Sequence, residues 1–315
     1  MRIKNCIFSD VQSIYLMVQL SLLGTLVLSS YSYAYEDKPV INWVALDIPP
    51  FEISYGPNKG KGYVDRIRNR FIKELPQYRH SSPTLVNQQR FFRLLSTGDY
   101  CHSTMRRTDA FNKIAIQSIP HFTGFSDVII TFEKNAQKLS KYGVPVPLHK
   151  ILKDGDSRLG VPSRTMGKIL DEIFREHGTE ENLLTRSSSQ VGKELLTLLQ
   201  KNRIDFTIDY PSAKRSWETN LQAKGLISLP IKELEELIPI GYITCSNTEL
   251  GRQIIKDSNR VIYRLLKDPK YVQDFILNAY PKELQHIVQE RVENHIQPAL
   301  ERYRESTEKD SAAVN

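Results

Sequence analysis

Short apolar runs alternate with amphipathic stretches along most of this chain, from residue 40 onward. The segment 41–48 (INWVALDI) is a predicted strand, and 62–76 (GYVDRIRNRFIKELP) is a predicted helix with its apolar residues on one face. Strands that alternate with helical patterns of about 10 to 15 residues are typical of βαβ units and a parallel sheet. The alternation therefore predicts an α/β fold.

The alternation occurs in two rounds. The first ends with a predicted strand at 125–134, after a predicted loop at 118–124, and the second covers 157–211. A chain of 315 residues is long enough for two lobes with their own cores. After a last strand at 237–246 the chain is predicted to be helical, and the polar segment 303–315 is predicted to be a disordered tail.

The N-terminus has the pattern of an export signal. Two basic residues precede an apolar run over 14–28, and Ser32 and Ala34 then satisfy the small-x-small rule for cleavage. This pattern predicts a signal peptide over 1–34, a mature chain that starts at Tyr35, and a periplasmic protein. The alternative is a membrane anchor, which would need about twenty apolar residues. The run is shorter and contains a glutamine and a glycine.

Cysteine usage fits export. Cys6 would be removed with the signal peptide, which leaves Cys101 and Cys245. An even pair in an oxidising compartment is usually a disulfide. The histidines are scattered and no Cys-x-x-Cys or His-x-x-x-His spacing occurs, so we expect neither a metal nor another cofactor.

The charge argues against a nucleic-acid partner. The net charge is +7, but the basic residues are spread along the chain rather than grouped. No cluster of basic and aromatic residues and no recognition helix stands out. We expect a monomer whose partner is a small solute.

Six short motifs, in their order and spacing, resemble the extracellular solute-binding proteins of family 3. This is the type II periplasmic group that includes amino-acid binders, and the resemblance covers about residues 38 to 285. The motifs are PPF (49–51), GKGYVDRI (60–67), STGDYCHSTM (96–105), SIPHF (118–122), RLGVPSRT (158–165) and LLQKNRIDFTIDY (198–210). The resemblance implies a two-lobed fold with two crossover strands and a helical C-terminus.

The resemblance also implies where the lobes divide. Lobe one covers 35–122 and 241–302, and lobe two covers 123–240. On that topology the strand of Cys245 lies beside the strand of Cys101, so the disulfide would lie within lobe one.

In this fold the ligand lies between the lobes, at the carboxyl ends of strands. Phe51 follows a double proline at the exit of the first strand, so it is either an apolar wall of the cleft or a plug of lobe one. Arg106 and Arg107 follow another strand and could bind a carboxylate or phosphate, or they could be solvated surface residues. Thr104 and Thr108 offer hydroxyl groups on the same rim.

Lobe two contributes further candidates. Ser163 and Thr165 precede a predicted helix, where a hydroxyl group either caps the helix or helps to bind an anion. Asp209 and Tyr210 close a predicted strand and, by the resemblance, face the cleft. No residue pattern indicates a nucleophile with a general base, so no catalytic residue is assigned.

The two charged anchors of the family's amino-acid binders are missing in an ungapped comparison. The position of the arginine that clamps the α-carboxylate, counted back from Ser118, is occupied by Phe111. The position of the aspartate that binds the ammonium, counted from Asp205, is occupied by Tyr210. We therefore predict an acidic, peptide-like or aromatic-containing solute, with Arg106 as the anion anchor and the aromatic residues as walls.

The predicted function is the capture of a small polar or anionic solute, for import through a permease of the ABC type in the inner membrane. The alternatives are a periplasmic enzyme of the dehydratase kind and a sensory or orphan binding protein, because these use the same fold.

Overall fold

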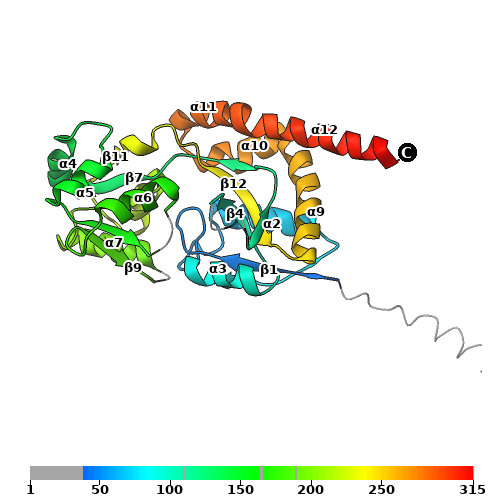
Figure 1. The fold of residues 1–315 in the computed structure, drawn as a ribbon, viewed down its shortest axis with the longest axis horizontal. Helices are drawn as coiled ribbons and strands as arrows, with labels where there is room; N and C mark the ends of the chain where they lie inside the picture. Colours follow the sequence, from blue (N-terminus) through cyan, green and yellow to red (C-terminus); the bar gives the residue numbers. More distant parts are fainter. Residues whose placement is uncertain (1–37, 109–110, 112, 164–165, 189, 315) are drawn as a thin grey trace, which may run out of the picture. The chain divides into compact units, whose positions relative to one another are not determined.

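The computed structural model describes residues 38–108, 111, 113–163, 166–188 and 190–314 (Figure 1). The predicted signal peptide and its cleavage site lie outside the described residues. Among the described residues, no helix combines the length and the apolar character needed to cross a membrane. From Val40 onward the chain forms one unit, and this unit contains two sheets.

The first sheet defines lobe one. Its central strand β4 is parallel to β1 and antiparallel to β12, and short strands extend the sheet on both sides. The strands are β1 (Val40–Ala45), β2 (Arg79–His80), β3 (Thr84–Leu85), β4 (Tyr100–Arg106), β5 (Ala115–Gln117), β6 (Phe122–Thr123) and β12 (Ile240–Ser246). The helices are α2 (Tyr63–Glu74), α3 (Gln88–Thr97), α9 (Glu249–Leu266), α10 (Pro269–Phe275), α11 (Lys282–Arg291) and α12 (Gln297–Val314), with a 3-10 turn η3 (Leu277–Ala279) and a π-helical turn η4 (Val292–Ile296).

The second sheet defines lobe two. Its strand order is β11-β7-β10-β8-β9, with β8, β9 and β10 mutually parallel and β7 antiparallel to β10 and β11. The strands are β7 (Val128–Phe132), β8 (Leu159–Pro162), β9 (Leu183–Arg186), β10 (Phe206–Asp209) and β11 (Leu226–Pro230). The helices are α4 (Glu133–Ser140), α5 (Leu148–Asp154), α6 (Lys168–His177), α7 (Val191–Gln200) and α8 (Pro211–Asn220), with a 3-10 turn η2 (Lys232–Leu234).

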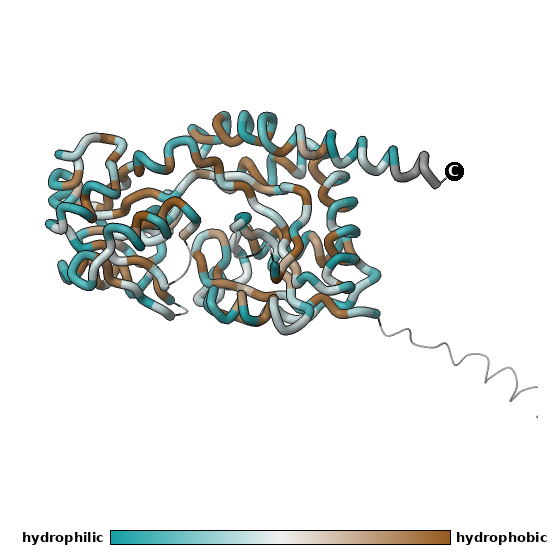
Figure 2. The backbone as a smooth tube through the Cα atoms, in the orientation of Figure 1, coloured by the Kyte–Doolittle hydropathy of each residue, from teal (hydrophilic) through white to brown (hydrophobic). Residues whose placement is uncertain are grey.

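Helices cover both faces of the sheet in lobe two, so apolar side chains are buried on both faces of its strands. Successive side chains of a strand point to opposite faces. In β7, Ile129 packs in one core cluster with Phe206, whereas Ile130 packs in another with Leu195 and Trp217. Figure 2 shows hydrophobic residues along the strands, whereas the coloured part of α12 is largely hydrophilic.

The chain crosses between the lobes twice. It leaves lobe one after β6 and returns in β12, which pairs with β6 as well as with β4 and β5. The predicted α/β fold with two lobes, two crossover strands and a helical C-terminus is confirmed.

The predicted disulfide is present. Cys101 in β4 lies directly opposite Cys245 in β12, with their Cα atoms 4.1 Å apart, and the bond joins residues 144 positions apart in sequence. Both cysteines are buried in the core of lobe one. All of lobe two lies in the loop that this bond closes.

The prediction of a disordered tail at 303–315 is wrong for the described residues, because α12 continues to Val314. Its first turn is anchored by Leu300, which is buried in the core of lobe one. Beyond it, Arg304 pairs with Glu301 at 2.9 Å and with Glu308 at 3.8 Å, one helical turn away on either side. A helix propagates easily from a packed turn, and pairs of this spacing support it.

His121 makes the stability of lobe one dependent on pH. Its side chain is 1% exposed, packs edge-on against Phe71 at 5.9 Å, and has no hydrogen-bond partner of good geometry among the described residues. Burial lowers the pKa of His121 to about 4, because weaker contacts with the backbone at Ser103 offset the burial only in part. The buried, uncharged His121 therefore makes its full contribution to stability above the unfolded-state pKa of about 6.5, and this contribution is lost as the pH falls toward 4.

Between pH 7 and pH 4.5, we expect the free energy of unfolding to fall by about 2.5 kcal/mol more in the wild-type protein than in His121→Phe. The free energy of unfolding in urea, measured at both pH values, checks this. His286→Gln is the control, because His286 is exposed and its replacement should leave the pH dependence unchanged. Equal losses in wild type and His121→Phe would contradict the prediction.

Candidate functional site

Two cavities lie between the lobes, at the carboxyl ends of β1, β8 and β10. The larger one has a volume of about 580 Å³ and the smaller one about 440 Å³. Leu46, Ile48 and Gln88 border both, so the cavities are two chambers of one cleft. In α/β folds, ligands bind where parallel strands end. We call them the larger chamber and the smaller chamber.

The loop after β1 forms part of both chambers. The Pro49-Pro50 peptide bond is cis, and Ile48 and Glu52 then pair across the turn with hydrogen bonds of 2.9 and 3.0 Å. Ile53 borders the larger chamber, whereas Phe51 and Glu52 border the smaller one. The loop therefore separates the chambers on the side of lobe one.

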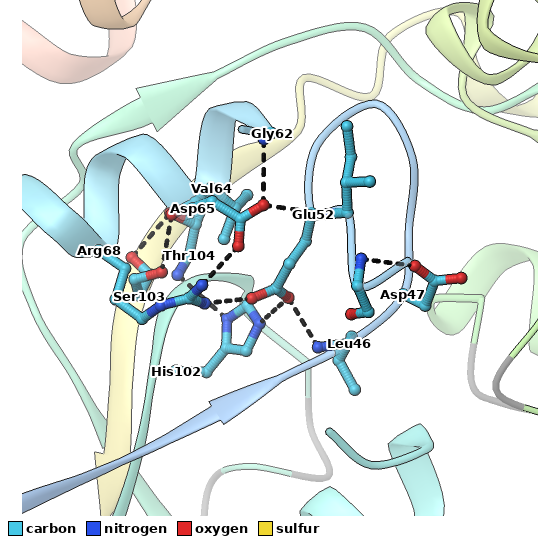
Figure 3. A network of polar contacts seen from close by, with 12 residues as sticks. Leu46, Asp47, Glu52, Gly62, Val64, Asp65, Arg68, His102, Ser103 and Thr104 are labelled. Carbon is cyan, nitrogen blue, oxygen red and sulfur yellow. Dashed lines mark hydrogen bonds and ion pairs between the residues drawn. The ribbon is translucent and has the colours of Figure 1, made fainter. Parts of the chain in front are cut away.

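A buried ionic network holds this loop in place (Figure 3). Glu52 is 1% exposed, and its carboxylate accepts hydrogen bonds from the backbone N–H of Leu46 at 2.7 Å and from His102 Nε2 at 3.0 Å. The Arg68 guanidinium bridges Glu52 and Asp65. Burial raises the pKa of Glu52, but His102, Arg68 and the Leu46 amide lower it more, so Glu52 is ionised at neutral pH.

Asp65 attaches the same loop to α2. Its Oδ2 accepts hydrogen bonds from the backbone N–H groups of Ile53 and Gly62, each at 3.0 Å. The carboxylate therefore also satisfies a free amide at the start of α2, where a negative charge is favoured. Asp65 matches the aspartate of the GKGYVDRI motif, but Glu52, Arg68 and His102 gave no signal in the sequence. A charged residue that will be buried has no local mark that distinguishes it from a solvated one.

Phe51 fills both of the roles that the sequence left open. Its ring packs against Phe122 at 6.3 Å and against the core of lobe one, and it also lines the smaller chamber. Across the cleft it meets the ring of Tyr210 edge-on at 5.1 Å. Tyr210 also lines the smaller chamber, so the two predicted aromatic residues form a contact between the lobes.

Arg106 lines the smaller chamber, but its guanidinium is already paired. It makes two hydrogen bonds with the carboxylate of Asp127, at 2.8 and 3.1 Å, and lies 4.6 Å from the ring centre of Tyr210. Burial lowers the pKa of Arg106, but the neighbouring Asp127 and Tyr210 raise it more, so the group stays charged. The hypothesis that Arg106 is the anion anchor is wrong, because the two guanidinium nitrogens that would bind a ligand carboxylate already donate to Asp127.

Phe111 does not reach the cleft. It is 2% exposed and packs with Phe91 and Phe92 in the core of lobe one, at ring distances of 6.3 and 5.0 Å. The prediction of a cleft wall at Phe111 is wrong. The core beside α3 has room for an aromatic ring, and an alternating sequence pattern cannot show which apolar side chains fill it.

The remaining candidates divide between the chambers. Thr104 and Arg107 line the smaller chamber, where Arg107 donates to Gln117 at 3.2 Å and lies over the ring of Tyr242. Ser163 and Asp209 line the larger chamber, and Ser163 accepts a hydrogen bond from Gln89 across the cleft at 3.3 Å. Thr165 lies outside the described residues.

The buried histidine of the network is fully hydrogen-bonded. Both ring nitrogens of His102 are occupied, one by Glu52 and the other by the Thr104 amide at 3.1 Å, which leaves this buried histidine no free nitrogen for a substrate. Among the described residues, no group of three or more His, Cys, Asp or Glu side chains is placed to hold a metal ion.

Comparison with known proteins identifies the fold. No protein-family model and no curated protein matches this chain. A solved substrate-binding protein of an amino-acid ABC transporter, AbpA from Streptococcus pneumoniae bound to L-arginine, is similar with a TM-score of 0.56 and 18% identity over 78% of this chain and 94% of that one. A histidine kinase sensor domain with similarity to periplasmic binding proteins has a TM-score of 0.57 and 13% identity over 75% and 93%.

A third similar structure is an ancestral amino-acid-binding protein that is a precursor of cyclohexadienyl dehydratase. Its TM-score is 0.54, with 16% identity over 75% of this chain and 92% of that one. The chain therefore has the two-lobed fold of the type II periplasmic binding proteins. At these identities the likeness is one of fold.

Proposed function

We propose that this protein binds a small polar or anionic solute in the cleft between its lobes, outside the cytoplasmic membrane, and presents it to an ABC importer. The observation that carries the proposal is the two-chambered cleft at the carboxyl ends of β1, β8 and β10. Two lobes joined by two crossover segments can close around a ligand by a hinge motion. The closed form would then present a surface to the permease.

The fold alone does not separate this role from two others, since its structural relatives include a sensor domain and a dehydratase precursor. An enzyme is disfavoured by the chemistry of the cleft, where the buried His102 has both nitrogens occupied and Glu52 is held in ion pairs. A sensory protein would use the same cleft and differ in its partner. Co-purification with a membrane partner distinguishes an importer from a sensor.

The ligand is proposed to differ from an ordinary α-amino acid held by the family's charged anchors. Phe111 lies in the core, Arg106 is paired with Asp127, and Tyr210 packs on Phe51. Among the predicted arginines, Arg107 is exposed on the smaller chamber and takes the role of anion anchor in this proposal. Export through a cleaved signal peptide, a monomeric state and the absence of a cofactor belong to the same proposal.

Native mass spectrometry of the exported protein is the test. We expect a small molecule to be carried through purification and to be released unchanged on unfolding. Returning that compound to the emptied protein should raise the melting temperature without turnover, because a ligand that binds only the native state stabilises it. Conversion of the compound would favour the enzyme, and no retained solute with no stabilisation by any compound tested would contradict solute binding.

A further inference from the structure

We infer that the solute is a short peptide that lies along both chambers, and not a single amino acid. The inference rests on the proposed function and names the substrate class of the same cleft. Each chamber alone, at about 580 and 440 Å³, falls in the range of about 300 to 1,000 Å³ that holds a drug-sized ligand. The shared residues Leu46, Ile48 and Gln88 place the two chambers next to each other.

Exposed apolar side chains border both chambers. Five large apolar residues are exposed among the described residues, and four of them line the cleft. Tyr55 and Leu221 border the larger chamber, and Ile169 and Leu237 border the smaller one. Exposed apolar side chains that are grouped around a cavity are typical of a surface that a ligand or partner covers. A ligand that covers both sets must carry apolar groups in each chamber.

The chambers differ in charge. Asp47 and Asp209 are partly buried in the larger chamber, whereas Arg107 and Lys168 border the smaller one, where Asp127 neutralises Arg106. Burial is the main reason that the pKa of Asp47 is raised, so its carboxylate would be stabilised by a cation nearby.

The larger chamber also has two cationic side chains. Arg186, which is partly buried like the two aspartates, donates to the Thr185 carbonyl, and Lys193 is exposed. The partly buried charges of this chamber are thus two carboxylates and one guanidinium, an excess of one negative charge. A ligand with an ammonium in this chamber and a carboxylate beside Arg107 matches that difference.

Gln88 supplies the middle of the site. It is the polar residue that borders both chambers, and its Oε1 is buried without a hydrogen-bond partner among the described residues. A buried unpaired polar atom is costly, and a ligand N–H placed there would remove that cost. A peptide carries a backbone amide between its charged ends. A free amino acid has no such amide.

Calorimetry with trileucine, N-acetyl-trileucine, trileucine amide and free leucine tests the inference. We expect trileucine to bind at least a hundredfold more tightly than leucine. Acetylation should weaken binding to the wild type about tenfold or more but should have little effect on binding to Asp209→Asn. Amidation should likewise weaken binding to the wild type but not to Arg107→Gln.

Gln88→Met should weaken trileucine binding about tenfold at an unchanged melting temperature of the free protein. The melting temperature of every variant without peptide shows that it is folded. Leucine binding as tightly as trileucine would overturn the inference and leave the proposed function standing, and so would a retained solute that is not a peptide. Failure of all four probes, together with no retained solute, would overturn both.

Discussion

Replacing both Cys101 and Cys245 with alanine is expected to lower the free energy of unfolding by about 5 kcal/mol. The bond closes a loop that spans 144 positions and contains all of lobe two, so its loss gives the unfolded chain a large amount of conformational freedom. It also joins β4 with β12, the strand in which the chain returns from lobe two. Unfolding by guanidinium chloride under non-reducing conditions measures the change.

The control is the same titration with a reductant. The reductant should destabilise the wild type by about as much as the double substitution, and it should leave the double variant unchanged. Two free thiols in the unfolded, non-reduced wild-type protein would contradict the disulfide.

Glu52→Gln is expected to lower the free energy of unfolding by about 3 to 5 kcal/mol. The substitution removes the negative charge that compensates Arg68, whose side chain is only 5% exposed. Asp65 remains as a partner, but it also accepts from the amides of Ile53 and Gly62 and cannot replace the lost carboxylate. Urea unfolding at pH 7 measures the loss.

Glu301→Gln is the matched control, because it makes the same chemical change in an exposed ion pair with Arg304. Exposed pairs contribute about 0 to 1 kcal/mol, so this variant should be close to the wild type. The prediction fails if Glu52→Gln and Glu301→Gln have similar stabilities. Since Glu52 holds the loop that borders both chambers, its replacement should also weaken solute binding.

Periodicity predicted the long elements well. Strand β1 and helix α2 lie where the apolar patterns predict them. Each element buries the apolar residues that recur within its own segment, so the local sequence is enough to predict it. The sequence pattern does not predict the short strands β5 and β6, and it predicts a loop for the segment that contains β6. Each exists because it pairs with β12, which is more than a hundred positions away in sequence.

The candidate site was predicted in outline. Strand ends indicated Phe51, Arg106, Asp209 and Tyr210, and all four line the cleft. Their contacts could not be predicted. The partner of Arg106 is Asp127, which immediately precedes β7 of the other lobe, and nothing near Arg106 in the sequence indicates it.

The sequence by itself determined the fold class and the two lobes, and the family resemblance implied the pairing of the cysteines. The fold class and the lobes follow from local periodicity, which is a property of neighbouring residues, and the resemblance follows from the order of motifs along the chain. Only the tertiary structure decided that Phe111 is a core residue, that Arg106 is paired, and that Glu52, Arg68 and His102 form a buried network. Glu52 and His102 are fifty positions apart, and burial and charge pairing between such residues arise only when the strands and helices that carry them pack together.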